Sequence, residues 1–192
     1  MKKFIFILII FLSSCSPSDD TEKTDKTSST SIEVSGEIKR ISVGNKDAKI
    51  TIIAYESLTC SHCANFHIDV FPQLKKDYID TGLAKIEFRH FPLDIAALNA
   101  SKIAQCKEDQ SLEILESLYS NQQAWIKGST VEAINQSLKK FIQNEGYTVN
   151  FEKCINNKEI EDFVLNDRIE GTTKFKVNAT PTIIINNKKF EK

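Results

Sequence analysis

The sequence lacks any hydrophobic run long enough to span a membrane. Its longest apolar stretch is the nine residues from Phe4 to Leu12, about half of the roughly 20 that a membrane-spanning helix needs. A permanent membrane anchor is therefore disfavoured, and this short run needs another explanation. We also find no internal repeat.

The chain also lacks an excess of charge of either sign. It carries 25 Lys and Arg against 26 Asp and Glu, a formal net charge of −1, and no long basic cluster. Proteins that bind nucleic acid present concentrated positive charge. Nucleic acid is therefore not an expected partner.

The apolar run has the layout of an export signal. Lys2 and Lys3 form a short basic segment before it, and the small residues Ser13 and Ser14 follow it, so we expect residues 1–14 to be a signal peptide. The sequence Leu12-Ser13-Ser14-Cys15 also resembles the lipobox of bacterial lipoproteins, in which the cysteine is acylated and becomes the N-terminus. This resemblance implies lipidation of Cys15 and a lipoprotein anchored to a membrane of the periplasm or cell envelope.

The segment after the signal is poor in apolar side chains. Ser, Thr, Asp, Lys and Glu dominate it until Ile32, and such a composition cannot bury enough surface to offset the entropy of ordering. We expect a flexible tether over 15–35. The remainder, 36–192, has the length of one domain.

The predicted compartment gives the cysteines a meaning. An exported protein keeps disulfides, and the five cysteines are Cys15, Cys60, Cys63, Cys106 and Cys154. If Cys15 carries lipid, four remain. They form one pair close in sequence and two cysteines about fifty residues apart.

A strand, a helix and a second strand surround the close pair. The isoleucine-rich stretch from Lys49 to Tyr55 predicts a central strand buried on both faces. Period-two alternation over 84–90 predicts another strand, so the unit is a right-handed βαβ motif. The helix between them should run from Cys63 to about Gly82, with a kink at Pro72. Steps of three and four residues predict its buried face to comprise Phe66, Val70, Phe71, Leu74 and Tyr78.

Cys60 and Cys63 lie where the first strand meets the helix. The free N–H groups and the dipole of a helix N-terminus favour an anion, and His62 adds positive charge or a hydrogen bond, so we expect a stabilised Cys60 thiolate and a shielded Cys63. Two other uses remain open. Cys60, Cys63 and His67 with one more residue would form a metal site, although no second Cys-x-x-Cys supplies the usual ligands, or the two cysteines would simply fill the core.

Two segments carry a family resemblance. The run ESLTCSHCANFH, Glu56 to His67, preceded by Tyr55, resembles the active site of the DsbA-type thiol:disulfide oxidoreductases, and KFKVNATPTIIIN, Lys174 to Asn186, resembles their cis-proline loop. The lipid- or signal-bearing DsbA proteins of alphaproteobacteria are the most similar. The resemblance implies an α/β thioredoxin-like fold with a helical insertion at about 94–171, and neither a metal nor an organic cofactor.

The resemblance also implies the roles of four further residues. The peptide bond between Thr180 and Pro181 is expected to be cis, with the backbone groups of Thr180 free to pair with a substrate chain as an added strand. Cys106 and Cys154 lie on apolar helix faces, and related proteins carry a second disulfide here, so we expect a structural disulfide. Two buried free thiols are the alternative.

Three other side chains are candidates of lower rank. Glu56 ends the first predicted strand, four residues before Cys60, and a partly buried carboxylate there could relay a proton to or from Cys63. A solvated surface acid is the alternative. His90 is expected to be an inward-facing core histidine, and Trp125 to belong to the core or to the surface of the helical insertion.

Together these features predict an envelope dithiol oxidase that introduces disulfides into reduced or misfolded exported proteins through Cys60 and Cys63. By resemblance, its electron acceptor is a DsbB-type membrane quinone reductase. A disulfide isomerase or reductase is the alternative enzyme, and a redox-silent envelope binding protein the alternative outside enzymes. One departure from the family is the stretch after the turn at Asn186-Asn187, where five residues stand in place of a last helix, so we expect a partly bare sheet face.

Overall fold

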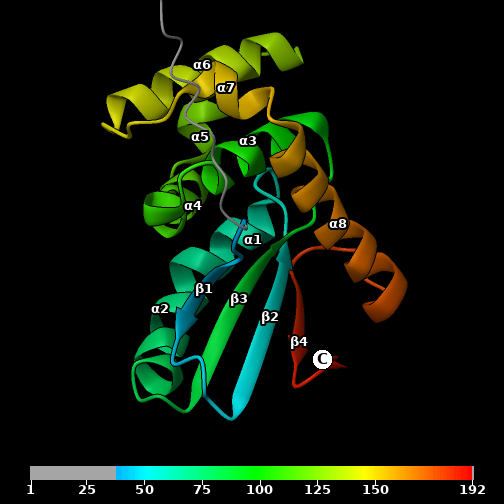
Figure 1. Ribbon diagram of the computed structural model, residues 1–192. Coiled ribbons are helices and arrows are strands. Elements are labelled where there is room, and N and C mark those ends of the chain that lie inside the picture. Colours follow the sequence, from blue (N-terminus) through cyan, green and yellow to red (C-terminus); the bar gives the residue numbers. More distant parts are fainter. Residues whose placement is uncertain (1–37, 192) are drawn as a thin grey trace, which may run out of the picture. The chain divides into compact units, whose positions relative to one another are not determined.

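The computed structural model describes residues 38–191, which form a five-stranded mixed sheet with helices on both faces (Figure 1). The predicted signal peptide over 1–14, the predicted lipidation site Cys15 and the predicted tether over 15–35 lie outside the described residues. The sheet order is β1-β3-β2-β4-β5. The strands are β1 (Ile41–Gly44), β2 (Ile50–Glu56), β3 (Ala84–His90), β4 (Thr182–Ile185) and β5 (Lys188–Lys189).

The two central strands are the predicted ones. β2 begins and ends one residue later than expected, and β3 has the expected bounds. They pair in parallel, with Ile52 opposite Ile86, whereas all other neighbours are antiparallel. A parallel pair needs a long crossover, which the helical segment between the two strands supplies. The predicted α/β thioredoxin-like class is confirmed.

The crossover is one helical segment interrupted by two π turns. It consists of α1 (Ser61–Asn65), the π turn η1 (Phe66–Val70), α2 (Phe71–Leu74) and the π turn η2 (Lys75–Ile79). The N–H of Phe71 donates to the carbonyl of Phe66, five residues back, so the break in the α-helical pattern comes immediately before Pro72. A π turn holds one extra residue.

The extra residues correct the predicted buried face of the crossover. Phe66 and Phe71 are buried, but Val70 is 50% exposed and Tyr78 is 48% exposed. Steps of three and four residues assume 3.6 residues per turn. The wider spacing within each π turn places Val70 and Tyr78, which lie inside η1 and η2, out of that phase, so the prediction for these two residues was wrong.

Seven helices follow β3. They are α3 (Ile95–Gln105), η3 (Glu108–Gln110), α4 (Ser111–Ser120), α5 (Gln122–Trp125), α6 (Val131–Asn144), α7 (Phe151–Ile155) and α8 (Lys158–Phe175). Side-chain oxygens of Asp94, Thr130, Asn150 and Asn157 accept backbone N–H groups at the starts of four of them, as N-cap residues do. Figure 1 shows α3 to α7 gathered beyond one end of the sheet and α8 running back along it.

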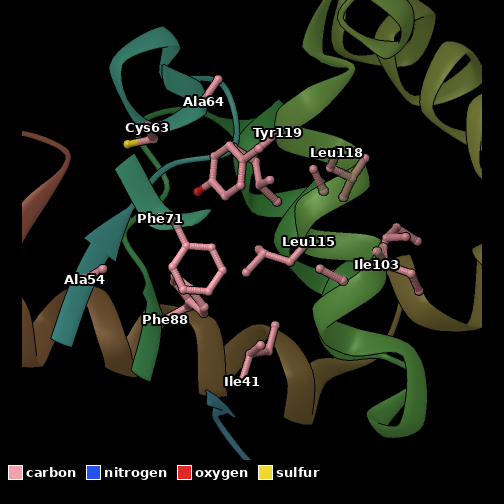
Figure 2. Packing of buried hydrophobic residues seen from close by; sticks show 14 of the residues in the cluster. Ile41, Ala54, Cys63, Ala64, Phe71, Phe88, Ile103, Leu115, Leu118 and Tyr119 are labelled. Carbon is pink, nitrogen blue, oxygen red and sulfur yellow. The ribbon is translucent and has the colours of Figure 1, made fainter. Parts of the chain in front are cut away.

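Alternate residues of β2 belong to two separate apolar clusters. Ile52 and Ala54 face the crossover, α3 and α4. Ile53 and Tyr55, on the other face, contact α8 and the loop after it. This is the two-sided burial expected of a central strand. In Figure 2 Phe71 of α2 and Phe88 of β3 lie together in the larger cluster, with Leu115 of α4 facing them.

Two contacts join elements that are distant in sequence, one between α8 and β2 and the other between α3 and α7. Gly171 of α8 lies against the ring of Tyr55, where an added Cβ would come within 2.8 Å of Cε1. Cys106, at the end of α3, forms a disulfide with Cys154 of α7, with the two Cα atoms 5.7 Å apart. Both features join segments that are distant in sequence.

The chain turns after β4 at Asn186 and Asn187, whose φ angles are 45° and 65°. Two successive residues with positive φ are typical of a type I′ hairpin turn, in which asparagine is a favoured residue. β5 follows, and Phe190 beyond it is 57% exposed.

Candidate active site

The cysteine pair lies at the start of the crossover, just after the end of β2. Cys60 is the N-cap residue of α1, with an extended backbone and a partly exposed side chain, and Cys63 is completely buried one turn further on. Both are free thiols. Between them Ser61 and His62 are exposed. The pair therefore has one sulfur that another molecule can reach and one that it cannot.

The loop before β4 closes the other side of the pair. The bond between Thr180 and Pro181 is cis, and the Cys60 thiol donates a hydrogen bond of 3.4 Å to the carbonyl oxygen of Thr180. The Thr180 hydroxyl lies beside Cys63. Four of the expected site residues, from segments about 120 positions apart, thus meet at one place.

The surroundings of Cys63 oppose its ionisation. Burial raises the pKa of the Cys63 thiol far above its usual value, and the charge of Glu56 raises that pKa further, whereas the Ser57 backbone and the Thr180 hydroxyl lower it. A thiol in this position keeps its proton unless a base accepts it.

Glu56 is buried beneath the pair and bonded to His67. Glu56 Oε2 and His67 Nε2 share a hydrogen bond of 2.8 Å, and each side chain is 2% exposed. Burial raises the pKa of Glu56, while the charge and hydrogen bond of His67 lower it part of the way back. Glu56 Oε1 and His67 Nδ1 are buried without a hydrogen-bond partner in the part of the chain that the structure describes.

The His67 ring is held by stacking. It lies almost parallel to the Tyr119 ring of α4, with the centroids 4.2 Å apart, and tilted against Phe88 at 4.9 Å. Figure 2 shows Tyr119 pointing its hydroxyl toward the side of the cluster on which Cys63 lies. Burial raises the pKa of Tyr119, and the charge of Glu56 raises it further, so this phenol remains neutral.

Sequence reasoning identified Glu56 but missed its partner. The sequence indicates His67 only as a metal ligand, whereas its Nε2 atom shares a hydrogen bond with Glu56. Residues 38–191 contain no group of three or more His, Cys, Asp or Glu side chains placed to hold a metal ion. The signal that was available is spacing, since His67 follows Cys63 by about one helical turn.

The two side chains assigned to the core are there. His90 is buried and bonded through Nε2 to Gln105 Oε1 at 3.2 Å, and burial lowers its pKa. Trp125 is completely buried and donates from Nε1 to the carbonyl of Leu118 at 2.8 Å. Neither side chain reaches the cysteine pair through these bonds.

No helix within residues 38–191 is long and apolar enough to cross a membrane. Lipidation at Cys15 falls outside that range and stays a prediction.

The family model described as thioredoxin matches residues 37–192. A putative protein-disulfide oxidoreductase of Rickettsia bellii is 32% identical over 151 residues, which are 78% of this chain and 58% of the relative. Disulfide bond formation protein D of Bacillus subtilis is 29% identical over 156 residues, 76% of this chain and 67% of the relative. The chain thus spans little more than half the length of the first of these relatives.

Solved structures show the same likeness. Wolbachia pipientis alpha-DsbA1 superposes with a TM-score of 0.68 at 32% identity, covering 79% of this chain and 78% of that one. Oxidised BdbD of Bacillus subtilis superposes with a TM-score of 0.62 at 23% identity, covering 80% and 84% of the two chains, a likeness of fold alone.

Proposed function

We propose, from the premise that this chain belongs to the DsbA-type members of the thioredoxin family, that it is a thiol:disulfide oxidoreductase that oxidises dithiols through Cys60 and Cys63. The observation that carries the proposal is the asymmetry of the pair. Cys60 is partly exposed beside the Thr180 carbonyl, and Cys63 is buried behind it. One sulfur can exchange with a substrate, and the other can close or open the internal disulfide.

The exchange follows from this asymmetry. A substrate thiolate attacks Cys60 Sγ of the Cys60–Cys63 disulfide, the S–S bond breaks, and Cys63 leaves with the electron pair. The second substrate thiolate then attacks its own sulfur in the mixed disulfide and releases Cys60 as a thiolate. Two electrons pass to the enzyme, and the substrate gains a disulfide.

Glu56 is positioned to handle the proton of Cys63. Burial raises the pKa of both groups, so the leaving Cys63 sulfur takes up a proton and the carboxyl holds one more readily than an exposed glutamate does. Glu56 would protonate Cys63 when the disulfide opens and accept that proton when it re-forms. The hydrogen bond with His67 Nε2 holds the Glu56 carboxyl in place for this role.

Cys60 lies at the start of a long helical segment, 61–79, and the free N–H groups and dipole of such a start would make its thiolate a good leaving group. His62 is exposed between the two cysteines and would tune how strongly the pair oxidises by acting on the same sulfur. A stable Cys60 thiolate favours the reduced enzyme, and hence oxidation of substrates. This favours an oxidase over an isomerase or reductase.

Thr180 would bind the substrate backbone. Its carbonyl oxygen is close enough to Cys60 Sγ to accept a hydrogen bond, and an extended substrate chain lying along the loop of Thr180 and Pro181 would place its cysteine sulfur near Cys60. The substrates would be reduced or misfolded exported proteins. A DsbB-type membrane quinone reductase would re-oxidise the pair.

The site of action would be the periplasm or cell envelope, with Cys15 lipidated after removal of residues 1–14. Membrane fractions of cells expressing the wild type and Cys15→Ala test this part. Loss of the protein from the membrane fraction only in the variant supports the anchor, and retention of both refutes it.

The function itself is tested by turnover of a reduced, unfolded two-cysteine substrate with wild type and Cys60→Ser. We expect disulfide formation with the wild type and none with the variant, although both are folded. Equal activity of the two would refute the proposal and favour a redox-silent binding protein. Equilibration with glutathione separates the enzymatic alternatives. The Cys60–Cys63 disulfide of an isomerase or reductase would be harder for glutathione to reduce than that of an oxidase.

A further inference from the structure

Gln122 connects the helices beyond β3 to the turn over residues 57–60, the active-site turn, which leads from β2 into α1. Its side-chain Nε2 donates one hydrogen bond to the carbonyl of Leu58 at 2.8 Å and another to the carbonyl of Cys60 at 3.0 Å. A primary amide has two N–H donors, and both are used on this one turn. Gln122 is more than sixty positions from the residues it contacts.

The backbone that carries Gln122 is firmly held. Gln122 begins α5, whose Trp125 is completely buried and bonded to Leu118 at the end of α4. The Gln122 carbonyl accepts the N–H of Ile126 at 2.9 Å. The amide is therefore presented from a fixed platform.

The turn that it contacts has a different set of bonds on its other side. The Cys60 N–H donates to the Ser57 carbonyl at 3.0 Å, and the Thr59 hydroxyl donates to Asp94 at 2.7 Å. These bonds fix the N–H of Cys60 and the Thr59 side chain. Gln122 binds the carbonyl groups of Leu58 and Cys60, and the Cys60 carbonyl also accepts the N–H of Ala64 at 3.2 Å, so the Gln122 amide adds a second donor that aims this carbonyl away from the helix axis.

A fixed carbonyl also fixes the N–H of the same peptide unit. In a trans peptide the C=O and the N–H point in opposite directions, so binding of the Cys60 carbonyl sets the direction of the Ser61 N–H at the start of α1. The N–H groups of a helix start are the ones that favour an anion. The orientation of this peptide unit therefore bears on the Cys60 thiolate.

We propose that Gln122 is a positioning residue that holds the peptide units on either side of the Cys60 turn in the orientation that stabilises the Cys60 thiolate. This inference rests on the proposed function only for the role of Cys60 as the exchanging sulfur. The helical segment after β3 thereby contributes directly to the reactivity of a cysteine that belongs to the sheet part of the fold.

The variants Gln122→Leu and Gln122→Glu test the inference. Leucine keeps most of the volume and removes both donors, and an ionised glutamate keeps the shape but presents only acceptors to two carbonyl groups. Gln123→Leu is the matched control, since Gln123 is the next residue and its side chain is exposed. Denaturant unfolding of each variant confirms that it is folded.

The measurement is the rate of Cys60 alkylation by iodoacetamide against pH, with Cys60 identified by peptide mass and the Cys106–Cys154 disulfide left intact. Below the midpoint of the wild-type profile we expect Gln122→Leu to react about fivefold more slowly, the effect of one ordinary hydrogen bond. We expect a larger decrease for Gln122→Glu, an unchanged plateau at high pH, and no change for Gln123→Leu.

Profiles of the Gln122 variants that superpose on the wild type would overturn the inference. An equal decrease at every pH would overturn it as well, because that pattern indicates altered access rather than a less stable thiolate. The assay needs no substrate turnover. If the wild type fails to oxidise dithiols while the Gln122 profiles shift as expected, the proposed function fails and the inference stands.

Discussion

Replacing His67 by leucine tests whether this buried partner of Glu56 stabilises the ionised Glu56 carboxyl. Leucine keeps an apolar side chain in the site but cannot share the 2.8 Å hydrogen bond. Glu56 would remain buried, and its other oxygen already has no hydrogen-bond partner among the described residues. The carboxylate would thus lose its one observed partner.

The expected loss of stability depends on pH. Leaving a buried carboxylate without its hydrogen-bond partner costs about 3 kcal/mol, and the lost stacking on Tyr119 costs about 1 kcal/mol at any pH. Burial raises the pKa of Glu56, and without His67 that pKa is higher still. A carboxyl whose pKa is raised on folding favours the folded state at low pH and loses that contribution as the pH rises through the folded pKa. We therefore expect a loss of about 1 kcal/mol where the carboxyl is protonated and of about 4 kcal/mol where it is ionised, so the loss is larger at pH 8 than at pH 5.

Guanidinium unfolding of the oxidised protein at pH 5 and pH 8 measures these losses without interference from thiol ionisation. The control is the double variant His67→Leu with Glu56→Gln, in which a neutral amide needs no counter-charge. It should be more stable than His67→Leu at pH 8 and differ little from it at pH 5. Equal losses at both pH values, or no recovery in the double variant, would refute the reasoning.

Three further outcomes follow from the contacts described. Cys63→Ser should accumulate mixed disulfides between Cys60 and substrate, visible on non-reducing gels, and their absence would contradict the division of roles. Replacing Cys106 and Cys154 together by alanine should cost about 4 kcal/mol in denaturant unfolding, on the chain-entropy model for a 48-residue separation; an unchanged midpoint would contradict it. Gly171→Ala should lower stability by about 1–3 kcal/mol, because its Cβ would meet the Tyr55 ring, and a thermal melt equal to that of the wild type would show that the ring moves aside.

The parts of the fold that the sequence predicted are those governed by short-range patterns. The isoleucine run of β2 and the alternation of β3 identified both central strands, because side-chain burial in a strand repeats every two residues. The position of Cys60 at a helix start followed from the strand before it. The asparagine pair at 186–187 indicated the hairpin.

The parts that were missed depend on contacts between distant segments. Val70 and Tyr78 were assigned to the core because a regular α-helix was assumed, and nothing in their spacing announces a π turn. The pairing of His67 with Glu56 joins two elements, and Gln122 reaches the active-site turn from α5. Such contacts exist only once the sheet and the helices have packed together.

The first π turn also has a meaning for how this chain can vary in length. A π turn is an α-helical turn with one additional residue, and in η1 the side chains of Ile68, Asp69 and Val70 are exposed. Deletion of one of these residues would join α1 and α2 into one unbroken α-helix and leave the phase of the flanking segments, including Cys63 and Phe71, as it is. Alignments of relatives should therefore allow a gap at 68–70 rather than shift the active-site helix against the sheet.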